Sequence, residues 1–163
     1  NNMLRQLTPQ EARKYTEDDP VRPHLSTEFR TTQLREMWGL FEDKYAEYDE
    51  PRVEPRAVVC VAYTSCVVTS EQELAAHPGE EVATFYTVWS YDRGAGRQIV
   101  NQLAQHTLNT KPQVREWVTL SPLTDMARIF HTRNGATLRR VADSCQVFDY
   151  TGVVLESEQA RSA

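Results

Sequence analysis

Residues 92–97, Asp-Arg-Gly-Ala-Gly-Arg, constrain the fold most strongly because they join a segment typical of a buried strand to a segment typical of a helix. The preceding residues 82–90 are mostly apolar, aromatic or β-branched at both parities, as in a strand buried on both faces. The following residues 98–107 place their apolar side chains at helical spacing. Glycines at such a junction allow main-chain amides to approach an anion, and the helix N-terminus adds a partial positive charge. These residues alone leave two interpretations open, a pyrophosphate-binding loop and an ordinary tight turn.

Length and charge restrict the classes to which the chain can belong. At 163 residues, we expect one domain spanning residues 1–163 with a hydrophobic core of its own. The net charge of −5 opposes contact with phosphate backbones, so nucleic acid is not an expected partner. The sequence has neither an apolar run of about 18 residues nor an apolar N-terminal segment. We therefore expect no membrane span and no signal peptide.

The cysteines and histidines indicate neither disulfides nor a metal. Cys60, Cys66 and Cys145 form no Cys-x-x-Cys pair, and the four histidines share no ligand spacing with them or with each other. We expect reduced thiols, a cytoplasmic location and no metal site.

Local patterns predict the remaining elements. Residues 1–30 are polar and interrupted by prolines, which predicts a helical N-terminal segment, and residues 156–163 predict a flexible tail. Between them the sequence predicts strands at 35–42, 57–69 and 115–120, a loop at 44–56, a helix at 123–133 and two short strands after it. This order predicts an α/β fold with a mixed sheet.

The run Arg93-Gly94-Ala95-Gly96, together with residues 127–136 (Ala-Arg-Ile-Phe-His-Thr-Arg-Asn-Gly-Ala), resembles the GCN5-related N-acetyltransferase (GNAT) superfamily. The resemblance implies a mixed, mostly antiparallel central sheet flanked by helices, and an acyl-coenzyme A whose pyrophosphate binds main-chain amides of the glycine loop. Tyr91 stands where the family usually has Gln or Arg. The implied coenzyme-binding residues lie at the end of the strand and on the loop: Val88, Trp89, Ser90, Arg93, Gly94, Ala95, Gly96, Arg97 and Gln98.

A narrower resemblance lies within the broader one. Residues 119–122 (Thr-Leu-Ser-Pro), His131-x-x-Asn134-Gly135-Ala136 and residues 142–144 (Ala-Asp-Ser) are similar to the acyltransferase-like domain of malonyl-coenzyme A decarboxylase. This resemblance implies that Ser121 and His131 act on a malonyl thioester.

His131 is the sharper of these two catalytic candidates. On a helix it lies at the margin of the apolar stripe formed by Met126, Ile129 and Phe130. An imidazole with an ordinary pKa gives or takes a proton at neutral pH, as acyl transfer to an amine or protonation of an enolate requires. The alternative is a half-buried histidine that only binds a main-chain carbonyl.

Ser121 ends a predicted strand directly before Pro122. Its hydroxyl could stabilise the negative charge that develops on a thioester oxygen. Alternatively, Ser121 is the N-cap of the following helix with Pro122 at its first position, unless Thr124 caps a later start.

Three functions follow from these residues and resemblances. The leading one is an acyl-coenzyme A-dependent N-acyltransferase that moves the acyl group of acetyl-coenzyme A, or of another acyl-coenzyme A, to an amine. The second is a malonyl-coenzyme A-type decarboxylase that uses Ser121 and His131. The third is a non-catalytic coenzyme A-binding or regulatory module. The sequence identifies neither the amine acceptor nor the oligomeric state, and a homodimer is one of the possible states.

Overall fold

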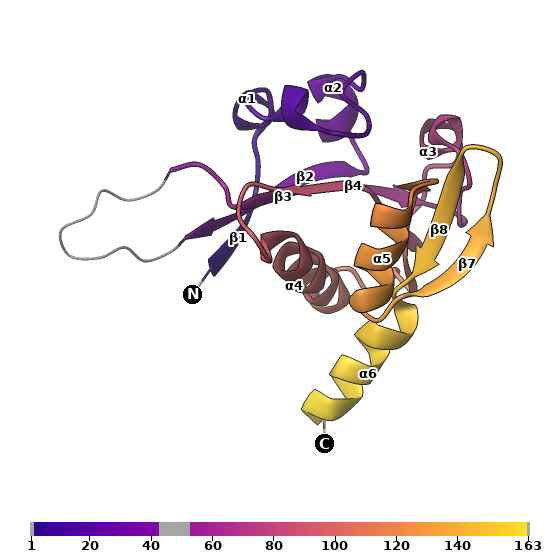
Figure 1. The fold of residues 1–163 in the computed structure, drawn as a ribbon. Helices are drawn as coiled ribbons and strands as arrows, with labels where there is room; N and C mark the ends of the chain where they lie inside the picture. Colours follow the sequence, from indigo (N-terminus) through magenta and orange to yellow (C-terminus); the bar gives the residue numbers. More distant parts are fainter. Residues whose placement is uncertain (1, 43–52, 163) are drawn as a thin grey trace.

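A central sheet organises the computed structural model, which describes residues 2–42 and 53–162 (Figure 1). Its strands are β1 (Asn2–Gln6), β2 (Arg35–Glu42), β3 (Ala57–Thr64), β4 (Val82–Ser90), β5 (Glu116–Thr119), β6 (Ser121–Pro122), β7 (Thr137–Val141) and β8 (Cys145–Asp149). The order across the sheet is β1-β2-β3-β4-β5-β8-β6, with β7 on β8. The β4–β5 pair is parallel, and the other described pairs are antiparallel. The predicted α/β fold with a mixed, mostly antiparallel sheet is confirmed.

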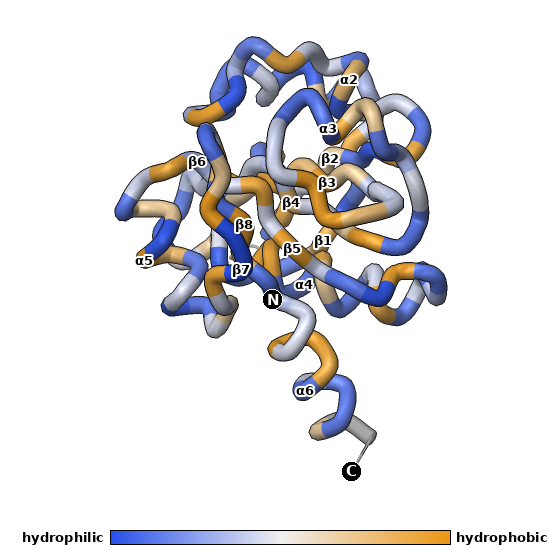
Figure 2. The backbone as a smooth tube through the Cα atoms, turned by 90° about the vertical axis from the view of Figure 1, so that its right-hand side faces the viewer, coloured by the Kyte–Doolittle hydropathy of each residue, from blue (hydrophilic) through white to orange (hydrophobic). Residues whose placement is uncertain are grey.

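Helices cover both faces of the sheet. On one side lie α1 (Pro9–Ala12), a 3₁₀ turn (Thr16–Asp18) and α2 (Thr27–Thr31), and α4 (Ala95–Thr110) crosses the other side (Figure 1). The short α3 (Glu71–Ala76) lies between β3 and β4, whereas α5 (Asp125–Arg133) follows β6 and α6 (Thr151–Ser162) follows β8. Each face has its own apolar core, one against α4 and one against the N-terminal helices. Apolar residues are concentrated along the central strand β3 (Figure 2).

The strand, loop and helix around the glycines form as their sequence predicts. In β4, residues 82–87 and Trp89 are buried, because helices cover both faces of this central strand. The apolar side of α4 packs on the sheet through residues at helical spacing: Ile99, Val100, Leu103, Ala104 and Thr107. The glycine loop is therefore held at the carboxyl end of β4.

Strands β4 and β5 separate at that same end. Their parallel pairing stops at Phe85 and Thr119, followed by one bond from the amide of Leu120 to the carbonyl of Phe85 at 3.0 Å. On the other side of β4, Cys60 pairs with Thr87 but Val61 pairs with Phe85, so Tyr86 is the extra residue of a bulge. A bulge bends its strand and changes its direction. Beyond it, β4 continues along β3, whereas the chain after β5 turns to pair with β8 as β6.

Four local predictions differ from the structure. The N-terminal segment begins with β1, an edge strand without a buried residue, so no apolar alternation revealed it. The second strand ends at Thr64 rather than residue 69. Helix α5 begins after Thr124, whose hydroxyl accepts from the amide of Ala127, and Ser121 lies in β6. Helix α6 runs to Ser162, so the expected tail is helical. Most of the predicted loop at 44–56 lies outside the described residues.

Candidate active site

The glycine loop leaves the N-terminus of α4 open to a ligand. Gly94 is the N-cap residue, with a φ of 82° in the left-handed region that favours glycine. No side chain among the described residues caps this end of α4, and the first turn of the helix holds no acidic residue. The amide of Ala95 donates to the carbonyl of Asp92 at 3.2 Å, which leaves the next amides of the first turn, those of Gly96 and Arg97, available to an anion beside the exposed cations of Arg93 and Arg97.

Arg56 braces the loop from the start of β3. Its carbonyl accepts from the amides of Tyr91 (2.8 Å) and Asp92 (3.3 Å). Its Nε donates to Oδ2 of Asp92 at 2.8 Å, and this ion pair reduces the repulsion that the carboxylate would exert on a phosphate. The loop sequence gave no sign of Arg56, which lies 36 residues before Asp92.

Tyr91 connects the loop to the N-terminal segment. Its hydroxyl donates to Oδ2 of Asp18 at 2.5 Å and accepts from Nε1 of Trp89 at 3.0 Å. Burial raises the pKa of the Tyr91 hydroxyl, so it remains a hydrogen-bond donor at neutral pH. This contact gives Tyr91 a structural role at the position where the sequence departs from the family pattern.

A cavity of about 780 Å³ opens where β4 and β5 separate. Its wall is mostly apolar, and its polar side chains are hydroxyls and one imidazole. None of its lining residues, all within the described part of the chain, is Asp, Glu, Lys or Arg. The lining residues are Pro20, Val21, Phe85, Tyr86, Thr87, Val88, Trp89, Ser90, Gly96, Val100, Leu120, Ser121, Pro122, Thr124, Met126, Ala127, Phe130 and His131.

His131 lies in the cavity wall with a fixed orientation. Its Nδ1 is 2.7 Å from the hydroxyl of Tyr150, which also accepts from Nδ2 of Asn134 at 3.2 Å. Since Asn134 supplies one hydrogen, the tyrosine's own hydrogen is free to go to Nδ1, and a neutral imidazole then carries its proton on Nε2. The ring also stacks on Phe148, with centroids 5.2 Å apart. No described residue accepts a hydrogen bond from Nε2, so in this tautomer the Nε2–H can donate to a ligand.

Burial changes the acid–base chemistry expected of His131. Desolvation lowers its pKa from 6.5 to about 4, so the expectation of an ordinary pKa is wrong. The neighbouring apolar stripe is largely exposed while the imidazole is buried: His131 is 5% exposed, whereas Met126 is 82% exposed and Ile129 40%. Helix α5 therefore turns its imidazole inward and two of its apolar side chains toward solvent. At neutral pH the imidazole is uncharged.

The low pKa of His131 predicts a pH-dependent contribution to stability. The unfolded chain binds a proton at this histidine below about pH 6.5, but the folded chain does so only below about pH 4. The free energy of unfolding should therefore fall by up to about 3 kcal/mol as the pH falls from about 6.5 to about 4. Above about pH 6.5 the imidazole is neutral in both states, and this loss of stability is absent. Urea unfolding of wild type and His131→Gln at several pH values measures the difference. Parallel pH profiles for the two proteins would contradict the prediction.

Ser121 lies in the same cavity wall and is 3% exposed. Its Oγ is 2.8 Å from Oγ1 of Thr119, which accepts from the amide of Phe148 at 3.2 Å. No described histidine or carboxylate bonds to Ser121, so the site lacks the base that would make this hydroxyl a covalent nucleophile. The N-cap alternative is wrong, because Thr124 caps α5. Ser121 is placed to hydrogen-bond a ligand.

The predicted coenzyme-binding residues divide into two groups. Val88, Trp89, Ser90 and Gly96 line the cavity. The others lie on the loop and the first turn of α4: Arg93, Gly94, Ala95, Arg97 and Gln98. The sequence did not point to Tyr150, which directly follows β8, lies 19 residues from His131 and orients its imidazole. Asn134 was named only as a motif residue, and its side chain acts through Tyr150, 16 residues away, rather than on His131 directly.

Known proteins resemble this chain in three-dimensional structure but not detectably in sequence. No protein-family model matches the sequence, and no curated protein matches it. Among solved structures, NAA60 of Arabidopsis thaliana in complex with acetyl-coenzyme A aligns with a TM-score of 0.63 at 12% identity, over 92% of this chain and 98% of that one. A putative acetyltransferase of the GNAT family from Desulfovibrio desulfuricans aligns with a TM-score of 0.60 at 12% identity, over 91% and 98%. This chain has the GNAT fold.

The structure of malonyl-coenzyme A decarboxylase from Agrobacterium vitis also aligns with this chain, with a TM-score of 0.63 at 20% identity. The match covers 85% of this chain but only 38% of the decarboxylase. Both resemblances expected from the sequence are thus confirmed at the level of the fold. In residues 2–42 and 53–162, no helix is long and apolar enough to cross a membrane, and no three His, Cys, Asp or Glu side chains are grouped to hold a metal.

Proposed function

We propose that this protein binds an acyl-coenzyme A and transfers its acyl group to a primary amine. One observation carries the proposal: the open N-terminus of α4 and the cavity are continuous through Gly96. This residue belongs to the first turn of α4 and also lines the cavity. A Cβ built there would lie 3.5 Å from Phe130, so a larger side chain would begin to fill the passage.

The residues present fit such a ligand. Arg93, Arg97 and the first amides of α4 suit the phosphates, and the uncharged cavity suits a pantetheine arm with a neutral acyl group. On the side facing β5, no strand in the described part of the chain pairs with β4 beyond Phe85. The main-chain groups of residues 88–90 on this side are therefore free of strand partners and suit the amides of the pantetheine.

In the proposed reaction the amine nitrogen attacks the thioester carbonyl carbon. The C–N bond forms, the C–S bond breaks, and the proton lost by the amine ends on the departing thiolate. The Nε2–H of His131 donates a hydrogen bond to the negative charge that develops during this exchange, and the hydroxyl of Ser121 is a second donor. His131 stays neutral throughout, as its lowered pKa requires. The cavity wall therefore never carries a charge of its own.

A decarboxylase is the second candidate. It is favoured because Ser121 and His131 line one cavity, and because the wall of that cavity holds no carboxylate, which an acyltransferase could use to deprotonate the ammonium group of its acceptor. There the C–C bond of a malonyl thioester breaks, carbon dioxide leaves, and the α-carbon of the enolate takes a proton from water. Ser121 and His131 would hydrogen-bond the enolate oxygen. The same wall offers the malonyl carboxylate no cation, which favours the transferase with a neutral acyl group.

Adding acetyl- and malonyl-coenzyme A separately to the purified protein tests the proposal. We expect acetyl-coenzyme A to raise the melting temperature of the protein, and malonyl-coenzyme A to remain unconverted. Among a set of primary amines, we expect at least one to be acylated, with release of free coenzyme A from acetyl-coenzyme A. Mass spectrometry follows each mixture. Conversion of malonyl- to acetyl-coenzyme A, lost in His131→Ala, would establish the decarboxylase instead. Binding without turnover in any mixture would leave a coenzyme A-binding module, and no stabilisation by either compound would overturn all three functions.

A further inference from the structure

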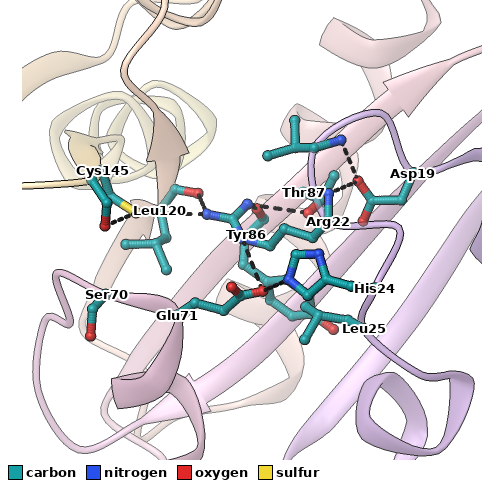
Figure 3. Close-up of polar contacts among 12 residues, drawn as sticks. Asp19, Arg22, His24, Leu25, Ser70, Glu71, Tyr86, Thr87, Leu120 and Cys145 are labelled. Atoms are coloured by element: carbon teal, nitrogen blue, oxygen red, sulfur yellow. Dashed lines mark hydrogen bonds and ion pairs between the residues drawn. The ribbon is translucent and has the colours of Figure 1, made fainter.

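Arg22 enters the sheet from the N-terminal segment at the point where β4 and β5 separate (Figure 3). Its side chain is buried, although it carries a charge. One terminal nitrogen donates to the carbonyl of Tyr86 and to Oγ1 of Thr87 (3.3 Å), and the other donates to the carbonyl of Leu120 at 3.0 Å. The guanidinium thus bridges the two strands immediately beyond their last pairing bond.

The groups that Arg22 joins cannot satisfy each other. The carbonyls of Tyr86 and Leu120 are both acceptors, and both are directed to the gap between the strands where the guanidinium lies. Buried carbonyls need a donor, which a continued pair of strands supplies through amide groups. Here the planar fork of one arginine supplies donors to both strands at once.

The main chain around Arg22 is fixed by a buried ion pair. Oδ1 of Asp19 accepts from the amides of Val21 (2.9 Å) and Arg22 (2.8 Å), and its Oδ2 is 2.7 Å from a terminal nitrogen of Arg30. The other terminal nitrogen of Arg30 donates to the carbonyl of Arg22 at 2.6 Å. Pro20 and Val21, between these anchors, line the cavity. The same loop therefore forms part of the cavity wall and aims the guanidinium at the sheet.

The charge of Arg22 faces a carboxylate that does not line the cavity. Its Nε lies 3.9 Å from Oε1 of Glu71 on α3, and that oxygen is 2.6 Å from Nε2 of His24 (Figure 3). A terminal nitrogen lies 3.9 Å from Sγ of Cys145. Arg22 is not a lining residue itself, whereas Tyr86, Thr87 and Leu120, which it holds, line the wall.

We propose that Arg22 is a positioning residue that keeps β4 and β5 apart and thereby sets the width of the acyl end of the cavity. The identity of the ligand rests on the proposed function, whereas the effect of Arg22 on the spacing of β4 and β5 does not depend on it. Loss of Arg22 leaves two buried carbonyls without donors, so the strands shift at residues 86–90 and 120–121. The glycine loop is anchored separately, through Arg56, and keeps its shape.

Hydrogen exchange and ligand binding together test this role in wild type, Arg22→Gln and Arg22→Lys, with Arg13→Gln as the matched control. Arg13 belongs to the same N-terminal segment, but its side chain is 64% exposed. In Arg22→Gln we expect amide exchange at residues 86–90 and 120–121 to rise at least tenfold, with β2 unchanged. The affinity for acetyl-coenzyme A should fall at least tenfold, while that for adenosine 3′,5′-bisphosphate, which lacks the pantetheine arm, stays within twofold. Arg22→Lys should be intermediate, and Arg13→Gln should match wild type.

Each other result has a definite meaning. Unchanged exchange at residues 86–90 and 120–121 would overturn the proposal. A uniform rise that includes β2, or equal losses of affinity for both compounds, would show a general role in stability and overturn it as well. If wild type binds no acetyl-coenzyme A, the proposed function fails, and the exchange pattern alone decides the role of Arg22.

Discussion

Asp19→Asn should lower the free energy of unfolding by about 3 to 5 kcal/mol. The carboxylate of Asp19 and the guanidinium of Arg30 are both fully buried and 2.7 Å apart. The substitution leaves the Arg30 charge in the interior without its anion, next to the buried Arg22, and a buried uncompensated charge is among the most costly defects a fold can contain. Urea unfolding of the variant and wild type at neutral pH measures the difference.

A double variant separates the cost of the unpaired charge from the cost of the lost contacts. Asp19→Asn combined with Arg30→Met removes both charges, so it should recover much of the stability lost in Asp19→Asn alone. Arg13→Gln breaks the exposed pair between Arg13 and Glu28 and should leave the unfolding midpoint unchanged. A loss below about 1 kcal/mol for Asp19→Asn would show that solvent or another group compensates Arg30.

The sequence predicted the parts of the site that depend on local pattern. β4, the glycine loop and α4 are adjacent along the chain, and their periods of two and 3.6 residues are read within short windows. The two motif residues Ser121 and His131 also meet in one cavity, as the narrower resemblance suggested. These features needed no knowledge of how distant segments pack.

The remaining features depend on contacts between distant residues. Arg22 bonds to Tyr86 and Leu120, which lie 64 and 98 residues further along the chain, and nothing in the polar run around it signals a buried charge. The bulge at Tyr86 has no glycine to mark it. The pKa of His131 is lowered by burial, which its place at the margin of a helical apolar stripe did not indicate. Tertiary packing, rather than local propensity, decides all three.

His131→Ala should reduce the turnover of acyl transfer by about 100- to 1000-fold, the usual effect of removing one donor to developing negative charge. Tyr150→Phe should reduce it by only about tenfold, because it removes the hydrogen bond that fixes the imidazole but keeps the Nε2 donor in the cavity. His77→Ala is the matched control, since His77 caps α3, is not a lining residue, and has a side chain 46% exposed. Initial rates of coenzyme A release with an accepted amine measure all three variants.

The pH profile distinguishes a hydrogen-bond donor from a general base at His131. A base with an ordinary pKa gives a rate that rises through about pH 6.5 as the imidazole loses its proton. With its pKa lowered to about 4, His131 is already neutral over the range from pH 5 to 8. The ratio of wild-type to His131→Ala turnover should therefore be constant across that range, because protonation of the acceptor amine affects both proteins alike. A ratio that rises through about pH 6.5 would show that His131 titrates there and acts by proton transfer.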